Sequence, residues 1–333
     1  MANAHFIRRI IGTTAVVTLV IAAAINANRS GSGADARTKL TLIAPAAPGG
    51  GWDLVARESQ RALRSDGIVN NVAVNNIAGA GGTIALSTLS QLQGAPSFMM
   101  VTGTVMMGGI TRNKADTKLH QLTPIARLAQ DFEVIAVPKD SPYLNLEELF
   151  AAWRADPGSI PIGGGSAGGI DHMLAAQMAR AAKIDPAKLT YSAHAGGGEL
   201  AISLLSSAPG TVEVGISGYN DFRDLFTNGS LRALAVVAPQ RLEGLDAPTM
   251  IELGYDSVDL VNWRGLVAPA GISAQQRAEL IAIAQEMVAT DSWQAAVARN
   301  RWQEWVLTGD EFGAFLAEEQ QRIDQILRDL GLA

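Results

Sequence analysis

Short apolar runs alternate with amphipathic stretches through most of this chain. Strands are predicted at 39–45, 71–77 and 189–195, because each is a short run rich in apolar or β-branched residues. After the first run, apolar residues recur at helical spacing from about Trp52, which predicts an amphipathic helix. Strands that alternate with helices in this way are typical of α/β folds with parallel sheets.

Each of four strand-to-helix junctions is rich in glycine. The junctions are 48–51 before a helix from 52, 79–82 before 84–92, 165–168 before 170–182, and 196–198 before 199–206. Glycine permits a sharp turn and a close approach to the backbone, and the first amides of a helix are unpaired and partly positive. We interpret the junctions as anion-binding turns. The alternative is that the glycines only relieve close packing of helix on strand.

None of these junctions contains Lys or Arg, and the nearest basic residue in sequence is Arg57. A Walker A loop would need a Lys-Ser/Thr pair after its last glycine, and no junction has one. Backbone amides are therefore expected to supply the affinity for an anion, without an arginine.

Two enzyme motifs overlap in the stretch IPIGGGSAGGIDHM, residues 160–173. It contains the dinucleotide fingerprint G-x-G-x-x-G and the nucleophile elbow G-x-S-x-G, centred on Ser166. A dinucleotide site needs an acidic residue at the end of the next strand, but Asp185 falls in a loop. A hydrolase needs a later histidine; His172 is too close along the chain, and His194 comes only at the next glycine turn. A serine hydrolase with Ser166 as nucleophile remains the alternative function.

No metal or cofactor site is predicted. Asp171 and His172 are adjacent, so their side chains diverge on a helix, and no metal-ligand spacing occurs elsewhere. The chain contains no cysteine, which excludes disulfides, thiolate ligands and thiol nucleophiles. The formal net charge is −6 and no basic run occurs beyond Arg8-Arg9, so nucleic acid is not expected as a partner.

The first 36 residues have the layout of a secretory signal peptide. Arg8-Arg9 precede an uncharged run at 10–27, and Ala34-Asp35-Ala36 forms an A-x-A cleavage site. An uncleaved anchor helix is the alternative, because the run approaches the ~18 residues that span a bilayer. An exported chain without a lipidated cysteine needs an outer barrier to retain it. We therefore expect a periplasmic protein, cleaved near Ala36.

Several motifs resemble those of one family. In order, they are APAAPGGGWDLVAR, NNIAGAGGT, TPIARL, VPKDSPY, GGGSAGGIDHMLA, AGGGELAISLL, GISGYNDF, NWRGLVAPAGIS and EEQQRIDQILRDLGL. The chain after residue 37 thus resembles the tripartite tricarboxylate transporter receptors, also called the Bug receptor family. The Trp52-Asp53 pair and GISGYNDF are similar to the tricarboxylate-type members.

The resemblance implies an α/β periplasmic binding protein of the two-lobed, type II-like Venus-flytrap kind, each lobe a mostly parallel sheet flanked by helices. It implies a monomeric receptor without cofactor, not an enzyme. Such a receptor binds a small carboxylate, either a tricarboxylate such as citrate or a dicarboxylate, and delivers it to integral membrane transporter subunits. An adaptor that presents its ligand to a membrane sensor is a further alternative.

By this resemblance the ligand contacts come from the glycine turns of both lobes. The expected residues are Pro48, Gly49, Gly50, Gly51, Trp52, Asp53, Gly79, Ala80, Gly81, Gly82 and Thr83 in lobe 1, and Gly165, Ser166, Ala167, Gly168, His172, Gly196, Gly197, Gly198, Ser217, Gly218 and Tyr219 in lobe 2. Asp53 either orients a ligand or caps its helix, Trp52 either walls the lobe or stacks on a ligand, and His172 is either a hydrogen-bonding strut or a ligand contact.

The lobe boundaries are predicted from two stretches that could cross between lobes. Residues 137–145 are interpreted as a crossing strand that ends in a loop, and 258–269 as the return. Lobe 1 is then 37–137 plus 262–333, and lobe 2 is 138–261. Ser273 and Gln276 predict a capping box for a helix at 274–289 in the tail, which we expect to pack on lobe 1.

Overall fold

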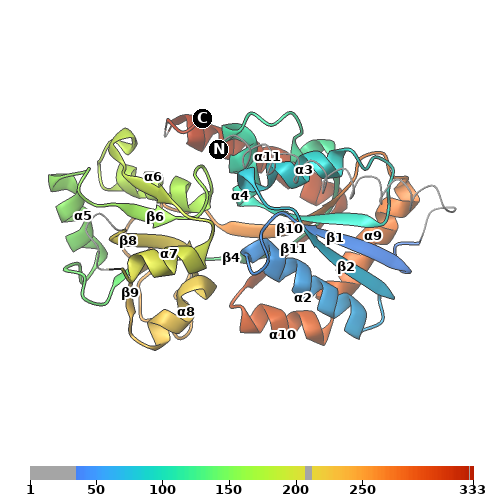
Figure 1. The fold of residues 1–333 in the computed structure, drawn as a ribbon, viewed down its shortest axis with the longest axis horizontal. Coiled ribbons are helices and arrows are strands. Elements are labelled where there is room, and N and C mark those ends of the chain that lie inside the picture. Colours follow the sequence, from blue (N-terminus) through green and yellow to red (C-terminus); the bar gives the residue numbers. More distant parts are fainter. Residues whose placement is uncertain (1–34, 207–211, 330) are drawn as a thin grey trace, which may run out of the picture.

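The computed structural model describes residues 35–206, 212–329 and 331–333. Nearly all of the predicted signal peptide lies outside the described residues. The described chain forms two lobes side by side, each a sheet with helices packed against it (Figure 1). This confirms the predicted α/β fold with two lobes. No described helix is both long enough and apolar enough to cross a membrane.

Lobe 1 is built on a six-stranded sheet in the order β11-β4-β10-β3-β1-β2. Its elements are β1 (Lys39–Ala44), α2 (Gly51–Ser65), β2 (Asn71–Asn76), η1 (Ala80–Gly82), α3 (Thr83–Ser90), β3 (Phe98–Gly103), α4 (Thr104–Arg112), η2 (Leu119–Gln121), β4 (Thr123–Asp131), β10 (Asn262–Ala268), α9 (Ala274–Val288), α10 (Asp291–Arg299), β11 (Gln303–Thr308) and α11 (Gly309–Asp329).

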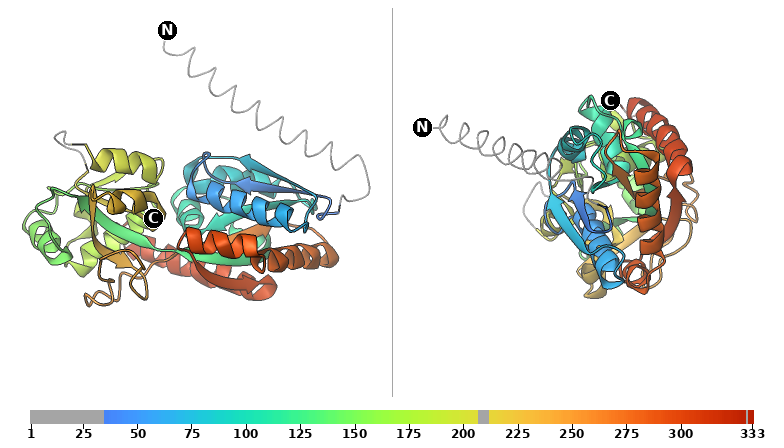
Figure 2. Two further views of the ribbon diagram at one scale, coloured as in Figure 1. Left: turned by 90° about the horizontal axis from the view of Figure 1, so that it is seen from below. Right: turned by 90° about the vertical axis from the view of Figure 1, so that its right-hand side faces the viewer.

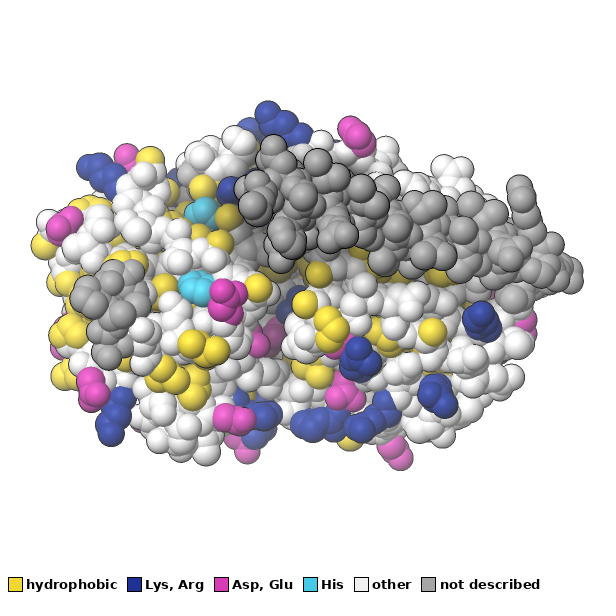
Figure 3. Space-filling view, viewed as in Figure 1, with side chains coloured by type: hydrophobic (Ala, Val, Ile, Leu, Met, Phe, Trp, Pro, Cys, Tyr) yellow, Lys and Arg dark blue, Asp and Glu magenta, His cyan; other side chains and the backbone are white. Residues whose placement is uncertain are grey.

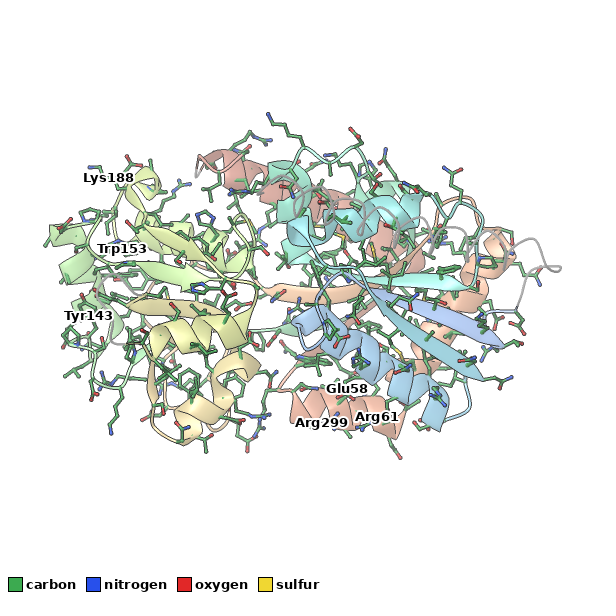
Figure 4. The ribbon with its side chains drawn as sticks, in the orientation of Figure 1. Glu58, Arg61, Tyr143, Trp153, Lys188 and Arg299 are labelled. Atoms are coloured by element: carbon green, nitrogen blue, oxygen red, sulfur yellow. The ribbon has the colours of Figure 1, made fainter. Side chains whose placement is uncertain are left out.

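Lobe 2 is built on a five-stranded sheet in the order β7-β6-β8-β5-β9. Its elements are β5 (Glu133–Pro138), α5 (Leu146–Ala155), β6 (Ile162–Gly164), α6 (Ile170–Ala181), η3 (Pro186–Lys188), β7 (Tyr191–Ala193), α7 (Gly197–Leu204), β8 (Val214–Gly218), α8 (Tyr219–Thr227) and β9 (Leu231–Val237). Tyr143 and Trp153 lie toward the end of this lobe that points away from lobe 1 (Figure 4).

The chain first crosses between lobes earlier than the sequence suggested. Strand β5 pairs with β8 and β9 of lobe 2, so the crossing lies at Phe132, between β4 and β5, and not within 137–145. The return enters lobe 1 as β10, which begins at Asn262. These segments join the two lobes in the left view of Figure 2.

The crossing strands also make the sheets mixed, where mostly parallel sheets were expected. Strand β4 runs toward lobe 2 and β10 returns from it, so the two pair antiparallel in the middle of the lobe 1 sheet. In lobe 2, β5 likewise runs antiparallel to both of its neighbours, while β6 pairs parallel with β7 and β8. The parallel pairs of lobe 1 are β1 with β2 and β1 with β3.

The C-terminal helices pack on lobe 1, and the last of them also touches lobe 2. Helix α9 begins at the predicted capping box, in which Ser273 and Gln276 bond each other's backbone amides. Helix α10 lies against α2, where Arg299 forms an ion pair with Glu58 at 2.6 Å (Figure 4). Helix α11 ends with Asp329 at 3.9 Å from Arg180 of α6, so the tail contacts both lobes.

Candidate ligand-binding site

The first glycine turn is held by Asp53, in the first turn of α2. Its buried carboxylate accepts hydrogen bonds from the amide of Gly49 at 2.8 Å, from Arg57 at 2.8 Å and from Asn76 at 2.8 Å. Burial opposes ionisation, but these hydrogen bonds, led by that from Arg57, outweigh it and lower the pKa of Asp53. Asp53 therefore stabilises the turn, and its oxygens are already engaged by protein donors.

Trp52 forms part of the lobe wall. Its side chain is buried, and carbons of its six-membered ring lie 3.0 Å from the position that a Cβ on Gly82 would occupy. Its Nε1 lies 3.4 Å from the corresponding position on Gly103 and has no hydrogen-bond partner. The ring thus supports the second glycine turn from beneath, which favours the wall over the ligand-stacking interpretation.

The second turn has an unusual backbone. Gly79, Ala80, Gly81 and Gly82 all have positive φ, at 127°, 50°, 62° and 90°. The amide of Gly82 donates to the carbonyl of Gly79 at 2.9 Å and that of Thr83 to Ala80, so the amides of Ala80 and Gly81 are the ones left to form a concave anion-binding nest. The first turn of α3 contains no acidic residue, and Asn113, directly after α4, fixes the nest by donating to the carbonyl of Ala80 at 2.9 Å. The nest therefore keeps its positive potential for a ligand.

The third turn is held by two side chains of α6. The amide of Gly165 donates to Asp171 at 2.6 Å, and the amide of Gly168 donates to Nδ1 of His172 at 3.0 Å. The His172 ring stacks on Tyr191 with centroids 4.0 Å apart. Burial, with the charge of nearby Arg112, lowers the pKa of His172 to about 4. His172 is accordingly a neutral strut beneath the turn.

The hydrolase alternative lacks a base in this geometry. Ser166 is exposed, and no hydrogen bond joins it to a histidine within the described ranges. Nδ1 of His172 is occupied by the Gly168 amide, and Nδ1 of His194 lies 3.2 Å from the carbonyl oxygen of Gly164 and 3.0 Å from that of Ser192. Nor does any group of three or more His, Asp or Glu side chains in the described chain form a possible metal site.

The fourth turn, Gly196–Gly198, repeats the carboxylate arrangement. Glu199 in the first turn of α7 accepts a hydrogen bond from the amide of Ala195 at 2.7 Å. In the neighbouring GISGYNDF segment, Ser217 donates to Asp221 at 2.7 Å. Tyr219 is buried against Phe226, so its side chain packs inside lobe 2 and does not face the cleft.

A cavity of about 190 Å³ lies where the two lobes meet. It brings together part of the predicted set, namely Ala80 and Gly81 with Ser166 and Ala167. Its other lining residues are Val105 and Gly109 of α4, Asn113 directly after α4, and Gly169. The first turn, the fourth turn and Ser217–Tyr219 do not line this cavity. A groove between the lobes is visible in Figure 3.

Helix α4 was absent from the sequence prediction of the site. A Cβ on Gly108 would lie only 2.1 Å from the carbonyl oxygen of Gly168, so this glycine allows lobe 1 to approach the third turn. The signal was the Gly108-Gly109 pair inside an apolar helical stretch, since glycine within a helix often marks close packing.

Sequence reasoning also missed the charged groups at the floor of the groove. Arg264 of β10 is nearly buried and lies 3.9 Å from Asp131, at the end of β4. Burial raises the pKa of Asp131 to about 6, and the charge of Arg264 opposes that rise. The four glycine turns themselves contain no arginine, but Nη2 of Arg264 lies 3.0 Å from the position that a Cβ on Gly51 of the first turn would occupy. The segment NWRG contains Arg264, but the sequence alone does not show where the side chain of an arginine within a strand points.

Two further carboxyl groups form a pair behind Asp131. Glu133 of β5 and Asp171 of α6 are both buried near Asp131, and Asn262 donates to Glu133 at 2.8 Å. Burial, then the charges of Asp171 and Asp131, raise the pKa of Glu133 well above its usual range. A raised pKa favours the neutral form of Glu133, so that the neighbouring buried carboxyl groups need not all be charged.

Comparisons with known proteins agree with this geometry. The model of the family described as "Tripartite tricarboxylate transporter family receptor" matches residues 55–332. Protein BugT of Bordetella pertussis is 28% identical over 304 residues, which cover 88% of this chain and 89% of that protein.

Solved structures share the fold. The periplasmic binding protein BugD has a TM-score of 0.76 at 22% identity, over 89% of this chain and 98% of that one. MatC from Rhodopseudomonas palustris, solved with bound malate, has a TM-score of 0.74 at 20% identity, over 87% of this chain and 99% of that one. The predicted periplasmic binding protein fold is confirmed, and the chain belongs to the tripartite tricarboxylate transporter receptor family.

Proposed function

We propose that this chain is a periplasmic receptor that binds a small carboxylate between its lobes and delivers it to the membrane subunits of a tripartite tricarboxylate-type transporter. The observation that carries the proposal is the cavity between the Gly79–Thr83 turn and the Ser166–Gly169 turn. No acidic residue stands in the first turn of α3, and the amides of Ala80 and Gly81 have no partner among the described residues, so these two amides are available to an anion. MatC, which shares the fold, holds malate, a small carboxylate.

A receptor fits the site better than an enzyme. Catalysis by Ser166 would need a base in hydrogen-bond contact with its hydroxyl group, and no described histidine bonds to Ser166. The family consists of receptors. Binding, followed by release to a partner, requires only the geometry of the cleft.

The bound molecule can be identified directly. Native mass spectrometry of protein purified rapidly from its source should show a complex heavier than the apo chain by the mass of a small carboxylic acid. Acid release and fragmentation would then identify that acid. A bound species without any carboxyl group, or an ester trapped as an acyl-enzyme, would contradict the proposed receptor function.

Export and processing form part of the same proposal. Residues 1–36 are expected to be removed, so material from the periplasm should begin at or close to Arg37. N-terminal sequencing checks this. A mature chain that still begins at Met1 or Ala2 would show that the apolar segment is retained.

Ser166 offers a matched pair of variants. Ser166→Phe should weaken ligand binding about tenfold or more, because the ring would occupy the cavity between the lobes. Ser166→Ala removes only a hydroxyl group, and should change the affinity by less than about tenfold. Calorimetry with the identified carboxylate measures both, after circular dichroism has shown that each variant is folded. Equal affinities for the two variants would place the ligand elsewhere.

Ligand binding should bring the two lobes together. The lobes are joined by the crossings at Phe132 and Asn262 and by α11, an arrangement that permits hinge closure. Small-angle scattering should show a smaller radius of gyration with saturating ligand, and no change with an uncharged diol of similar length. A radius that stays constant at saturation would argue against closure.

A further inference from the structure

Arg264 has a hydrogen-bonding capacity that the protein does not use. Its side chain is 9% exposed, yet it makes no hydrogen bond with any described residue, and its ion contact is the 3.9 Å approach to Asp131. A guanidinium group carries five N–H donors. Buried charges are normally paired and hydrogen-bonded, because desolvation is costly otherwise. These unused donors therefore point to a partner that comes from outside the protein.

The side of Arg264 that faces lobe 1 favours an anion. Nη2 lies 3.0 Å from the position that a Cβ on Gly51, the exposed first residue of α2, would occupy. The amides of Gly51, Trp52 and Asp53 have no hydrogen-bond partner among the described residues. A carboxylate at this point would meet a guanidinium group that can bind both of its oxygens, next to these unpaired amides.

The side that faces lobe 2 is acidic. Oδ2 of Asp131 lies 2.9 Å from the position of a Cβ on Gly218, so it faces the start of α8. Asp221, in the first turn of α8, is exposed, and its carboxylate also lies against Gly197 at the start of α7. Glu133 and Asp171 are buried nearby, and burial together with the charge of Asp171 raises the pKa of both Asp131 and Glu133. A basic side chain and acidic side chains are both visible in the groove between the lobes (Figure 3).

The single positive charge of this region does not suit a ligand with three negative charges. Arg264 supplies one positive charge, while Asp131 and Asp221 supply two carboxylates close to it. A second ligand carboxylate beside Arg264 would be repelled by them, whereas an ammonium or hydroxyl group could donate to them. The short separation of Arg264 and Asp131 suits a ligand that bears both groups on adjacent carbons.

On the basis of the proposed function, we propose that Arg264 binds one ligand carboxylate and that Asp131 and Asp221 accept hydrogen bonds from a donor next to it. The ligand class is then the amino- and hydroxy-substituted carboxylates, in preference to unsubstituted dicarboxylates and to tricarboxylates. Arg264 is the ligand-binding residue, and the two aspartates set the specificity.

A matched ligand series tests the donor. Succinate, malate and aspartate share one skeleton and carry hydrogen, hydroxyl and ammonium at the same carbon; glutarate, 2-hydroxyglutarate and glutamate form the same series one carbon longer. By calorimetry, the substituted members of the better-fitting series should bind about tenfold or more tightly than the unsubstituted member. Citrate should bind more weakly than malate or aspartate. If succinate, glutarate or citrate binds best, the proposed specificity for amino- and hydroxy-substituted carboxylates is wrong.

Variants with matched controls separate the two roles. Arg264→Gln should weaken every member about 100-fold or more, whereas Arg61→Gln, which removes an exposed charge on the same lobe, should not (Figure 4). Asp221→Asn should reduce the preference for aspartate over succinate, and Asp224→Asn on the exposed side of α8 should leave it unchanged. Circular dichroism and thermal melts establish that each variant is folded.

The outcomes are distinguishable from failure of the proposed function. Wild-type affinity in folded Arg264→Gln would overturn the inference while leaving a carboxylate receptor intact. If neither series binds, the structure of the acid identified by native mass spectrometry decides whether the inferred ligand class is right. An acid with one or two carboxylates and an ammonium or hydroxyl group next to one of them supports the inference, and a tricarboxylate or an acid without such a group overturns it. The absence of any bound or binding carboxylate would instead refute the proposed function itself.

Discussion

A carboxylate in the first turn of a helix accepts a hydrogen bond from a backbone amide of the glycine turn that precedes it, and the rest of the cleft depends on this interaction. Asp53 bonds Gly49, Asp171 bonds Gly165 and Glu199 bonds Ala195. Each bond fixes a turn that glycine would otherwise leave flexible. Each also places a negative charge at a helix N-terminus, where an external anion would compete with it. The geometry of these three turns is therefore obtained at the expense of their attraction for anions.

The remaining positive potential is concentrated on lobe 1. The Gly79–Thr83 turn has consecutive positive φ angles and no acidic residue in the helix that follows it. Arg264 adds a positive charge, and its N–H groups donate no side-chain hydrogen bond to any described residue. Lobe 2 contributes Asp171, Asp221 and Glu133, and burial raises the pKa of Glu133 well above its usual range. A cleft with one cationic wall and one acidic wall would orient a ligand that has a dipole, and the attraction would help to draw the lobes together.

The sequence predicted the parts of this arrangement that depend on local pattern. Alternating apolar runs gave the strands and helices, the glycine turns fell at the ends of strands, and the capping box at Ser273 and Gln276 formed as expected. The family motifs identified the two-lobed fold. These features are legible because each depends on residues close together in the chain.

The missed features depend on residues that are distant in sequence. The crossing at Phe132 was misplaced because an apolar strand does not show which sheet it joins. Gly108 was overlooked because its role is contact with Gly168 in the other lobe. Arg264 was overlooked because its importance comes from burial without a hydrogen-bond partner, which only the tertiary structure reveals.

A crystal structure of the receptor with its co-purified ligand tests the central claim most directly. The account predicts a ligand carboxylate oxygen within about 2.7–2.9 Å of a guanidinium nitrogen of Arg264, the range of a charge-assisted hydrogen bond. It also predicts a donor atom of the ligand on Asp131 or Asp221. A carboxylate bound by turn amides alone, with Arg264 still in contact only with Asp131, would contradict it.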